Sequence, residues 1–176
     1  MDYFEFYDIP LSFRPDQALV KKKFYALSKE FHPDFHLGES EEKQQEILDL
    51  STLNNKAFQT LSHPDKVLPY ILQLKGILTE GEKYALPQDF LMEMMEVNEA
   101  IMELEMEEDA AQAEKVLQQV NDFENSLNTE FQEAVTKFEQ SGETDRAAAL
   151  LQIKDIWYRK KYLLRIRESI NKFASR

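Results

Sequence analysis

The sequence has no cysteine among its 176 residues. It therefore forms no disulfide, and it offers no thiolate ligand to zinc or to an iron–sulfur cluster. Glycine and proline, with four and six copies, are also scarce. Few turns, together with many leucine, glutamate, glutamine, alanine, lysine and methionine residues, predict an all-α protein.

Long apolar runs are absent as well. No stretch is long enough to span a bilayer, and the N-terminal sequence MDYFEFYDIP lacks a basic region followed by an apolar one. We therefore expect no membrane partner, no signal or transit peptide, and a cytoplasmic protein. The formal charge of -12 argues against general nucleic-acid binding.

The charge is unevenly distributed along the chain. Residues 1–75 hold nine basic and twelve acidic residues, a net of -3, whereas residues 76–176 hold twelve and twenty-one, a net of -9. Four lysines of the first part form a local basic group: Lys21, Lys22, Lys23 and Lys29. A basic patch therefore stands on an otherwise acidic chain.

This basic patch lies on a helix predicted over residues 17–31, which Asp16 is placed to cap. The apolar residues of that helix share one face: Val20, Phe24, Leu27 and Phe31. The helix runs into His32-Pro33-Asp34, where the chain must turn, because a proline inside a helix costs about 3 kcal/mol. An imidazole, a rigid ring and a carboxylate on an exposed loop beside a basic helix suit a docking surface better than a reaction centre.

A second His-Pro-Asp occupies residues 63–65. It follows a helix predicted over residues 42–61, one face of which holds Ile47, Leu50, Asn54, Phe58 and Leu61. Ser62 stands three residues before Asp65, with apolar residues beyond, which is the pattern of a capped helix start with proline in its first turn. We interpret this copy as structural. Pro69 is expected to shorten or kink the helix that begins here.

Glycine and proline gather in residues 76–88, which we predict to be a linker. Three long helical patterns follow, at about 88–107, 110–139 and 143–173. Long helices with short connections pack as an antiparallel bundle. The predicted domains are therefore residues 1–75 and a three-helix bundle over residues 89–176.

The first bundle helix has three faces. Its core face is expected to hold Phe90, Met94, Val97, Ile101 and Leu104. Roughly 140° away lies an apolar face, called here the methionine face, with Leu91, Met92, Met95, Met102 and Met106. The remaining side is an acidic face with Glu96, Glu99, Glu103 and Glu107.

Two interpretations of the methionine face stay open. It packs on a second neighbouring helix or on the N-terminal domain, or it is an exposed, adaptable strip that docks another protein. Residues 154–176 hold eight basic and two acidic residues, a net of +6. We expect part of the acidic face to pair with this last segment, each exposed pair contributing about 0–1 kcal/mol.

Residues 1–75 resemble a J-domain. DYFEFYDIP is similar to its opening aromatic turn, VKKKFYALSKEFHPD to its basic helix and His-Pro-Asp loop, and LNNKAFQTLSHPDKVLPYIL to the helices that follow. The remainder, beginning QLKGIL and DFLMEMMEVNEAIMELE, is similar to the HscB-type co-chaperones of iron–sulfur cluster assembly. In that family a short J-domain precedes a three-helix C-terminal bundle.

The resemblance implies a two-ended adaptor. Its J-domain would bind an HscA/DnaK-type chaperone in the ATP state and stimulate ATP hydrolysis there. The implied chaperone-binding residues are His32, Pro33, Asp34, Lys22, Tyr25 and Lys29. The last three lie on the helix face opposite the apolar residues, and charge complementarity at such a surface mainly raises the association rate.

The bundle would hold the iron–sulfur cluster scaffold protein, an IscU-type client. The implied client-binding residues are Leu91, Met92, Met95, Glu96, Glu99, Glu103 and Trp157. Some relatives carry N-terminal cysteines for a metal. Because this chain has none, we predict no metal and no cofactor of its own.

Three other functions stay open. A J-domain co-chaperone with a different client would keep the first site and change the second. An enzyme would use some of the three histidines, but the sequence lacks a cysteine nucleophile, a glycine-rich phosphate loop, a zinc helix and a nucleophile elbow, so no catalysis is expected. A purely structural adaptor would treat the His-Pro-Asp tripeptide as an ordinary loop.

Overall fold

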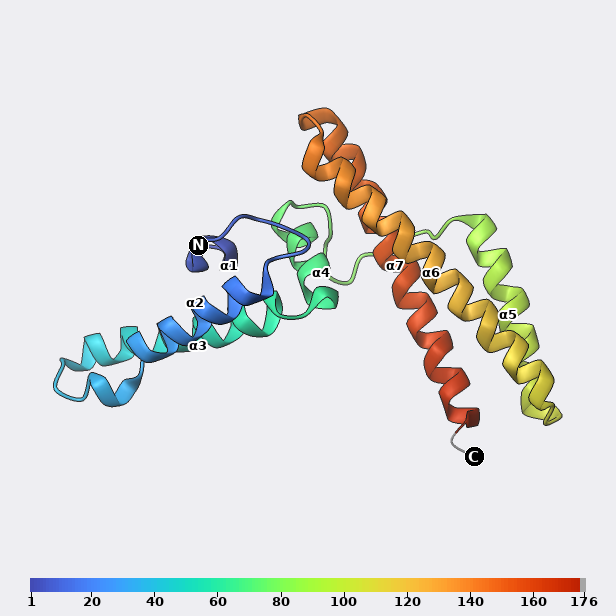
Figure 1. Ribbon diagram of the computed structural model, residues 1–176, viewed down its shortest axis with the longest axis horizontal. Coiled ribbons are helices and arrows are strands. Elements are labelled where there is room, and N and C mark those ends of the chain that lie inside the picture. The colour runs from blue at the N-terminus through green and yellow to red at the C-terminus, as the bar shows by residue number, and fades with distance from the viewer. Residues whose placement is uncertain (175–176) are drawn as a thin grey trace. The chain divides into compact units, whose positions relative to one another are not determined.

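The computed structural model describes residues 1–174 and consists of helices and connecting turns, with no strand in that range (Figure 1). The all-α prediction is therefore confirmed. The chain forms two compact units, Met1–Gly76 and Ile77–Arg176. Within residues 1–174, no helix is long and apolar enough to cross a membrane.

The first unit is built on an antiparallel helix pair. Its elements are α1 Tyr3–Tyr7, α2 Gln17–Glu30, the 3₁₀ turn η1 Pro33–Phe35, α3 Glu41–Leu61 and α4 Pro64–Leu74. Figure 1 shows α2 and α3 lying side by side, joined at one end by the loop that contains η1. The pairing places the His-Pro-Asp loop at the tip of the hairpin.

Helix α2 starts where its cap predicts. The carboxylate of Asp16 accepts hydrogen bonds from the backbone N–H groups of Ala18 and Leu19, at 2.9 and 3.3 Å, which satisfies two of the unpaired donors at the helix start. Val20 is fully buried, and the Phe24 ring stacks on Phe58 of α3 with centroids 4.1 Å apart. The apolar face of α2 therefore packs on α3, which leaves its lysine face to solvent.

A buried asparagine of α3 links three helices of the first unit, α1, α2 and α3. The Tyr7 hydroxyl donates to Oδ1 and to the backbone carbonyl of Asn54, at 2.8 and 3.1 Å. Asn54 Nδ2 donates to the Phe24 carbonyl and to Ser28 Oγ, at 3.1 and 3.0 Å. Burial raises the pKa of Tyr7, so its hydroxyl remains a donor. One side chain of α3 thus fixes α1 and α2.

Replacing Asn54 is expected to destabilise the first unit selectively. Asn54→Ala removes the hydrogen bonds of this buried side chain to the Tyr7 hydroxyl, the Phe24 carbonyl and Ser28 Oγ, which should lower the free energy of unfolding by about 2–4 kcal/mol. Urea titration followed by far-UV circular dichroism measures the loss. Trp157, the single tryptophan, lies in the second unit and provides the control, since its fluorescence transition should stay in place. A normal urea midpoint for the first unit would contradict this account.

The second His-Pro-Asp begins α4, as the sequence predicts, but Ser62 does not cap it. Ser62 Oγ donates instead to the Phe58 carbonyl and so closes α3, while no side chain caps α4. The start of α4 relies on the His63 carbonyl, which accepts from the N–H groups of Lys66 and Val67. The hydroxyl of Ser62 is therefore bonded to the preceding helix and is not available to cap the next one.

Proline has only a local effect inside α4. The helix contains Pro69 and still runs to Leu74, so the proline does not end it. Val67, Leu68, Ile71 and Leu72 are buried around this position, and their packing offsets the missing backbone bond.

The second unit is a three-helix bundle. Its helices are α5 Gln88–Met106, α6 Ala110–Gln140 and α7 Glu143–Ala174. Figure 1 shows α6 and α7 running alongside each other over most of their length. The core face predicted for α5 is buried at Phe90, Met94, Val97 and Ile101, whereas Leu104 is half-buried.

Helix α7 pairs with α6 rather than with the acidic face of α5. The Arg159 guanidinium donates two hydrogen bonds to the Glu130 carboxylate, at 3.2 and 2.6 Å. Arg167 does the same with Glu124, at 3.0 and 2.6 Å. Within residues 1–174, the acidic face has no ion-pair partner, so the expected pairing was wrong. Arg159 and Arg167 therefore lie on the side of α7 that faces α6, away from the acidic face of α5.

Candidate functional site

The His-Pro-Asp loop is short and held in a defined shape. Residues Pro33–Phe35 form one 3₁₀ turn, in which the N–H groups of Phe35 and His36 donate to the carbonyls of His32 and Pro33 at 3.0 and 2.9 Å. A ring nitrogen of His36, Nε2, also lies 2.8 Å from the Glu30 carbonyl at the end of α2. The loop is therefore fastened to the helix that precedes it.

Within this turn, the His32 and Asp34 side chains are presented to solvent. They are 51% and 77% exposed. His32 Nδ1 accepts a hydrogen bond from the Asp34 backbone N–H at 3.3 Å, which in the neutral ring leaves the proton on Nε2. The Asp34 carboxylate lies 3.8 Å from the same Nδ1. The turn thus presents an imidazole and a carboxylate in defined positions, where a partner protein can contact both.

The basic face predicted on α2 is exposed. Lys22, Tyr25 and Lys29 all face solvent, within roughly 60° of one another around the helix axis. Lys23 belongs to the same basic group, but its Nζ lies 3.8 Å from the Asp8 carboxylate. The structure therefore brings Lys22, Tyr25 and Lys29 onto one surface that leads to the His-Pro-Asp loop.

An apolar groove beside this loop was not predicted from the sequence. It has a volume of about 310 Å³. Its lining includes Pro33, His36, Leu37, Ile47 and Leu48. Leu37 and Leu48 are exposed, so the groove adds apolar surface next to the motif proline. Its residues come from two separate segments, and no sequence pattern joins them.

The methionine face of α5 is largely open to solvent. Met92, Met95, Met102 and Met106 are 61%, 67%, 63% and 87% exposed, and Leu91 is half-buried. One of the two interpretations required a neighbouring helix to cover this face. Within the described part of the second unit, no helix covers these four methionines. Flexible, polarizable methionine side chains in an exposed row suit contact with another protein.

The acidic face borders this apolar row. Glu96, Glu99 and Glu103 are exposed, and none of them has an ion-pair partner within residues 1–174. Unpaired carboxylates beside an apolar strip favour a partner that is apolar at its centre and basic at its rim.

Trp157 lies on α7 and is half-buried. Helix α5 meets α7 at Tyr162, whose hydroxyl accepts from Asn98 Nδ2 at 3.2 Å and whose ring meets the Phe90 ring edge-on. Trp157 lies about 140° from Tyr162 around the α7 axis, with Tyr158 between them. The indole of Trp157 therefore lies on a different side of α7 from Tyr162, the residue that contacts α5.

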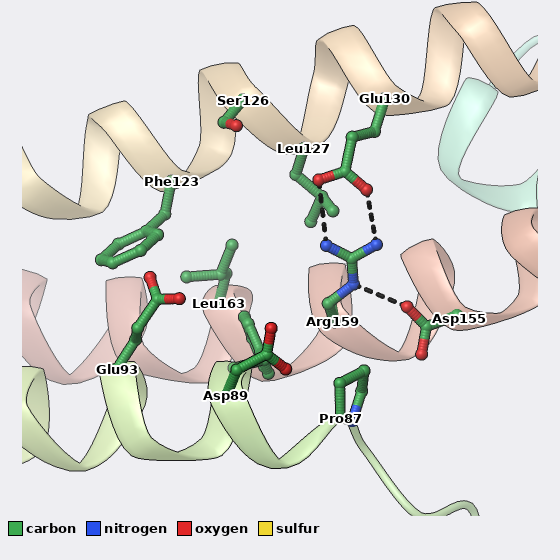
Figure 2. A pocket seen from close by; sticks show the side chains of 11 residues that line it. Pro87, Asp89, Glu93, Phe123, Ser126, Leu127, Glu130, Asp155, Arg159 and Leu163 are labelled. Atoms are coloured by element: carbon green, nitrogen blue, oxygen red, sulfur yellow. Dashed lines mark hydrogen bonds and ion pairs between the residues drawn. The ribbon is translucent and has the colours of Figure 1, made fainter.

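A polar cavity of about 350 Å³ lies elsewhere in the bundle (Figure 2). Figure 2 shows Arg159 between Glu130 and Asp155, with Asp89 and Glu93 of α5 nearby. Arg159 Nε donates to Asp155 Oδ2 at 2.8 Å. Because both of these carboxylates are satisfied by the same guanidinium, the cluster acts as a cross-link between α6 and α7. Within residues 1–174, no group of three or more histidine, aspartate or glutamate side chains is arranged to hold a metal ion.

Comparisons with known proteins agree with this architecture. Residues 86–171 match the family model described as the HSCB C-terminal oligomerisation domain. The co-chaperone protein HscB homolog of Vibrio cholerae is 37% identical over 102 residues, which are 57% of this chain and 60% of that protein. The crystal structure of human co-chaperone protein HscB matches with a TM-score of 0.70 and 28% identity, over 99% of this chain and 82% of that one.

The resemblance of this chain to HscB-type co-chaperones is therefore confirmed, in the C-terminal domain by the family model and in the fold by the solved structure. A second solved structure, chaperone HscB from Vibrio cholerae, matches with a TM-score of 0.63 and 25% identity, over 98% of this chain and 99% of that one. The HscB fold assigns a J-like domain to the first unit and the C-terminal helical bundle to the second. The matched stretch spans 60% of the length of the curated HscB relative.

Proposed function

We propose that this chain is an HscB-type co-chaperone with two working ends. Its first unit stimulates ATP hydrolysis by an HscA/DnaK-type chaperone, and its bundle delivers an IscU-type iron–sulfur scaffold protein to that chaperone. The observation that carries the proposal is the exposed, hydrogen-bonded His32-Pro33-Asp34 turn at the end of a helix with an exposed lysine face. The proposal keeps the cytoplasmic location expected from the sequence.

The chaperone end acts by docking. The side chains of Lys22 and Lys29 give α2 a positive face, which favours an acidic surface on the chaperone and speeds its encounter. The same encounter brings the His-Pro-Asp turn to the chaperone in a fixed orientation. Steady-state ATP hydrolysis by the chaperone, measured with increasing amounts of this protein, tests the proposal. A rate that rises to a plateau supports it, and an unchanged rate contradicts it.

The client end acts through Leu91, Met92 and Met95 of the methionine face, through the acidic face and through Trp157 of α7. Exposed methionines supply an adaptable apolar centre, and Glu96, Glu99 and Glu103 supply a charged rim. Isothermal titration with the purified scaffold protein tests this half of the proposal. Binding of some other client on the same surface, with no scaffold binding, would favour a J-domain co-chaperone with a different client.

The protein is expected to have no ATPase activity of its own. The sequence holds no glycine-rich phosphate-binding loop and no nucleophile elbow, so no group is expected to position a phosphate or an attacking water. Phosphate release from ATP by the isolated protein should equal the buffer blank. Turnover that copurifies with the protein and is lost in Asp34→Asn would contradict this expectation.

A further inference from the structure

Residues 77–84 form a strap that packs on α7. Lys154 Nζ donates to the Ile77 carbonyl at 2.9 Å and to Glu82 Oε2 at 3.1 Å, and Leu78 is buried. The hydrogen bond from Lys154 lowers the pKa of Glu82 below its ordinary value. The strap is therefore fastened to α7 by a charged pair as well as by an apolar anchor.

The strap holds Tyr158 of α7 on two sides. The Tyr158 ring stacks on Tyr84 with centroids 4.3 Å apart and planes 6° apart, and its hydroxyl donates to Glu82 Oε1 at 3.0 Å. The Tyr84 hydroxyl donates to Asp155 Oδ1 at 2.7 Å. Burial raises the pKa of both tyrosines to about 12, so both hydroxyls remain donors at neutral pH.

Tyr158 in turn bounds the indole of Trp157. The two rings meet edge to face with centroids 4.9 Å apart and planes at 74°. Lys161 Nζ lies 4.4 Å from the Trp157 ring centroid and 5.7 Å from that of Tyr158. A half-exposed tryptophan without such neighbours samples several rotamers, whereas these contacts favour one.

We propose that the strap is a positioning element of the client surface. Tyr84 and Glu82 hold Tyr158, and Tyr158 holds Trp157 in the orientation in which it meets the client. This inference rests on the proposed function, in which Trp157 contacts the scaffold protein. A side chain that is ordered before binding loses less freedom on binding, so loosening the strap should weaken client binding about three- to tenfold.

The single tryptophan makes the positioning claim measurable without any client. In Tyr84→Ala, the fluorescence anisotropy of Trp157 should decay faster in the free protein. The Kd for purified scaffold protein should rise about three- to tenfold. Tyr84→Phe is the matched control, because it keeps the ring stack and loses only the hydroxyl bond to Asp155. Both quantities should stay within about twofold of wild type in that variant.

Equal anisotropy decay and equal Kd in Tyr84→Ala and wild type would overturn the inference. If Tyr84→Ala lowers the helix content in circular dichroism, Glu82→Ala decides instead, since it releases the Tyr158 hydroxyl and leaves the ring stack in place. The same two changes are expected from it, and their absence would overturn the inference. Failure of the wild type to bind scaffold protein would contradict the proposed function, while the anisotropy comparison would still decide whether the strap orders Trp157.

Discussion

Asp34→Asn is expected to abolish stimulation of the chaperone ATPase. The Asp34 carboxylate is exposed, takes no part in the core, and carries the only negative charge of the His-Pro-Asp turn. Asparagine keeps its size and removes its charge, so the loss should reflect recognition rather than folding. Chaperone-catalysed ATP hydrolysis should fall to the rate of the chaperone alone, with unchanged circular dichroism.

The second tripeptide supplies a matched control for this prediction. Asp65→Asn makes the same change in His63-Pro64-Asp65. That tripeptide begins α4, whereas the first tripeptide lies in the loop that joins α2 to α3. Stimulation by this variant should equal that of wild type. Normal stimulation by Asp34→Asn, or equal losses in the two variants, would show that the first tripeptide is not the recognition element.

Leu91→Ala combined with Met95→Ala is expected to weaken scaffold binding by about 2–4 kcal/mol, roughly 30- to 1000-fold in Kd. Met95 is exposed and Leu91 half-buried on the methionine face, so their loss removes apolar contact area with a small effect on the bundle. Isothermal titration with scaffold protein measures the change, and thermal unfolding checks the bundle. Stimulation of the chaperone without scaffold should be unaffected.

Two methionines further along α5 provide the control. Met102 and Met106 are similarly exposed but lie outside the residues implied by the family resemblance. Met102→Ala with Met106→Ala should change the Kd by less than about tenfold. If this pair costs as much as the first, the client surface is centred elsewhere on α5. If the Leu91 and Met95 change unfolds the bundle, those side chains belong to the core.

Much of the fold follows from local patterns in the sequence. The 3.6-residue period and the proline at position 33 place α2 and its end, and Asp16 identifies its start. Asn54 also gave a signal, because a polar residue on the apolar face of α3 requires buried partners. The bounds of α2 depend on neighbours within one or two helical turns, whereas the partners of Asn54 lie 26 to 47 residues away in sequence and could not be identified in advance.

Other features depend on how distant segments meet. The exposure of the methionine face could not be decided from the sequence of α5 alone, because it depends on which sides of α5 the other two helices cover. The acidic face stayed unpaired because α7 turns Arg159 and Arg167 toward α6. The strap contact between Tyr84 and Tyr158 joins residues far apart in sequence, and neither residue carries a pattern that predicts it.

The most direct test of the two-ended account is chaperone ATP hydrolysis measured with and without scaffold protein for three versions of this chain. Wild type should raise the rate, and scaffold protein should raise it further. Leu91→Ala with Met95→Ala should keep the first increase and lose the second, whereas Asp34→Asn should lose both. A scaffold-dependent increase of full size in the Leu91 and Met95 variant, or in Asp34→Asn, would contradict the account.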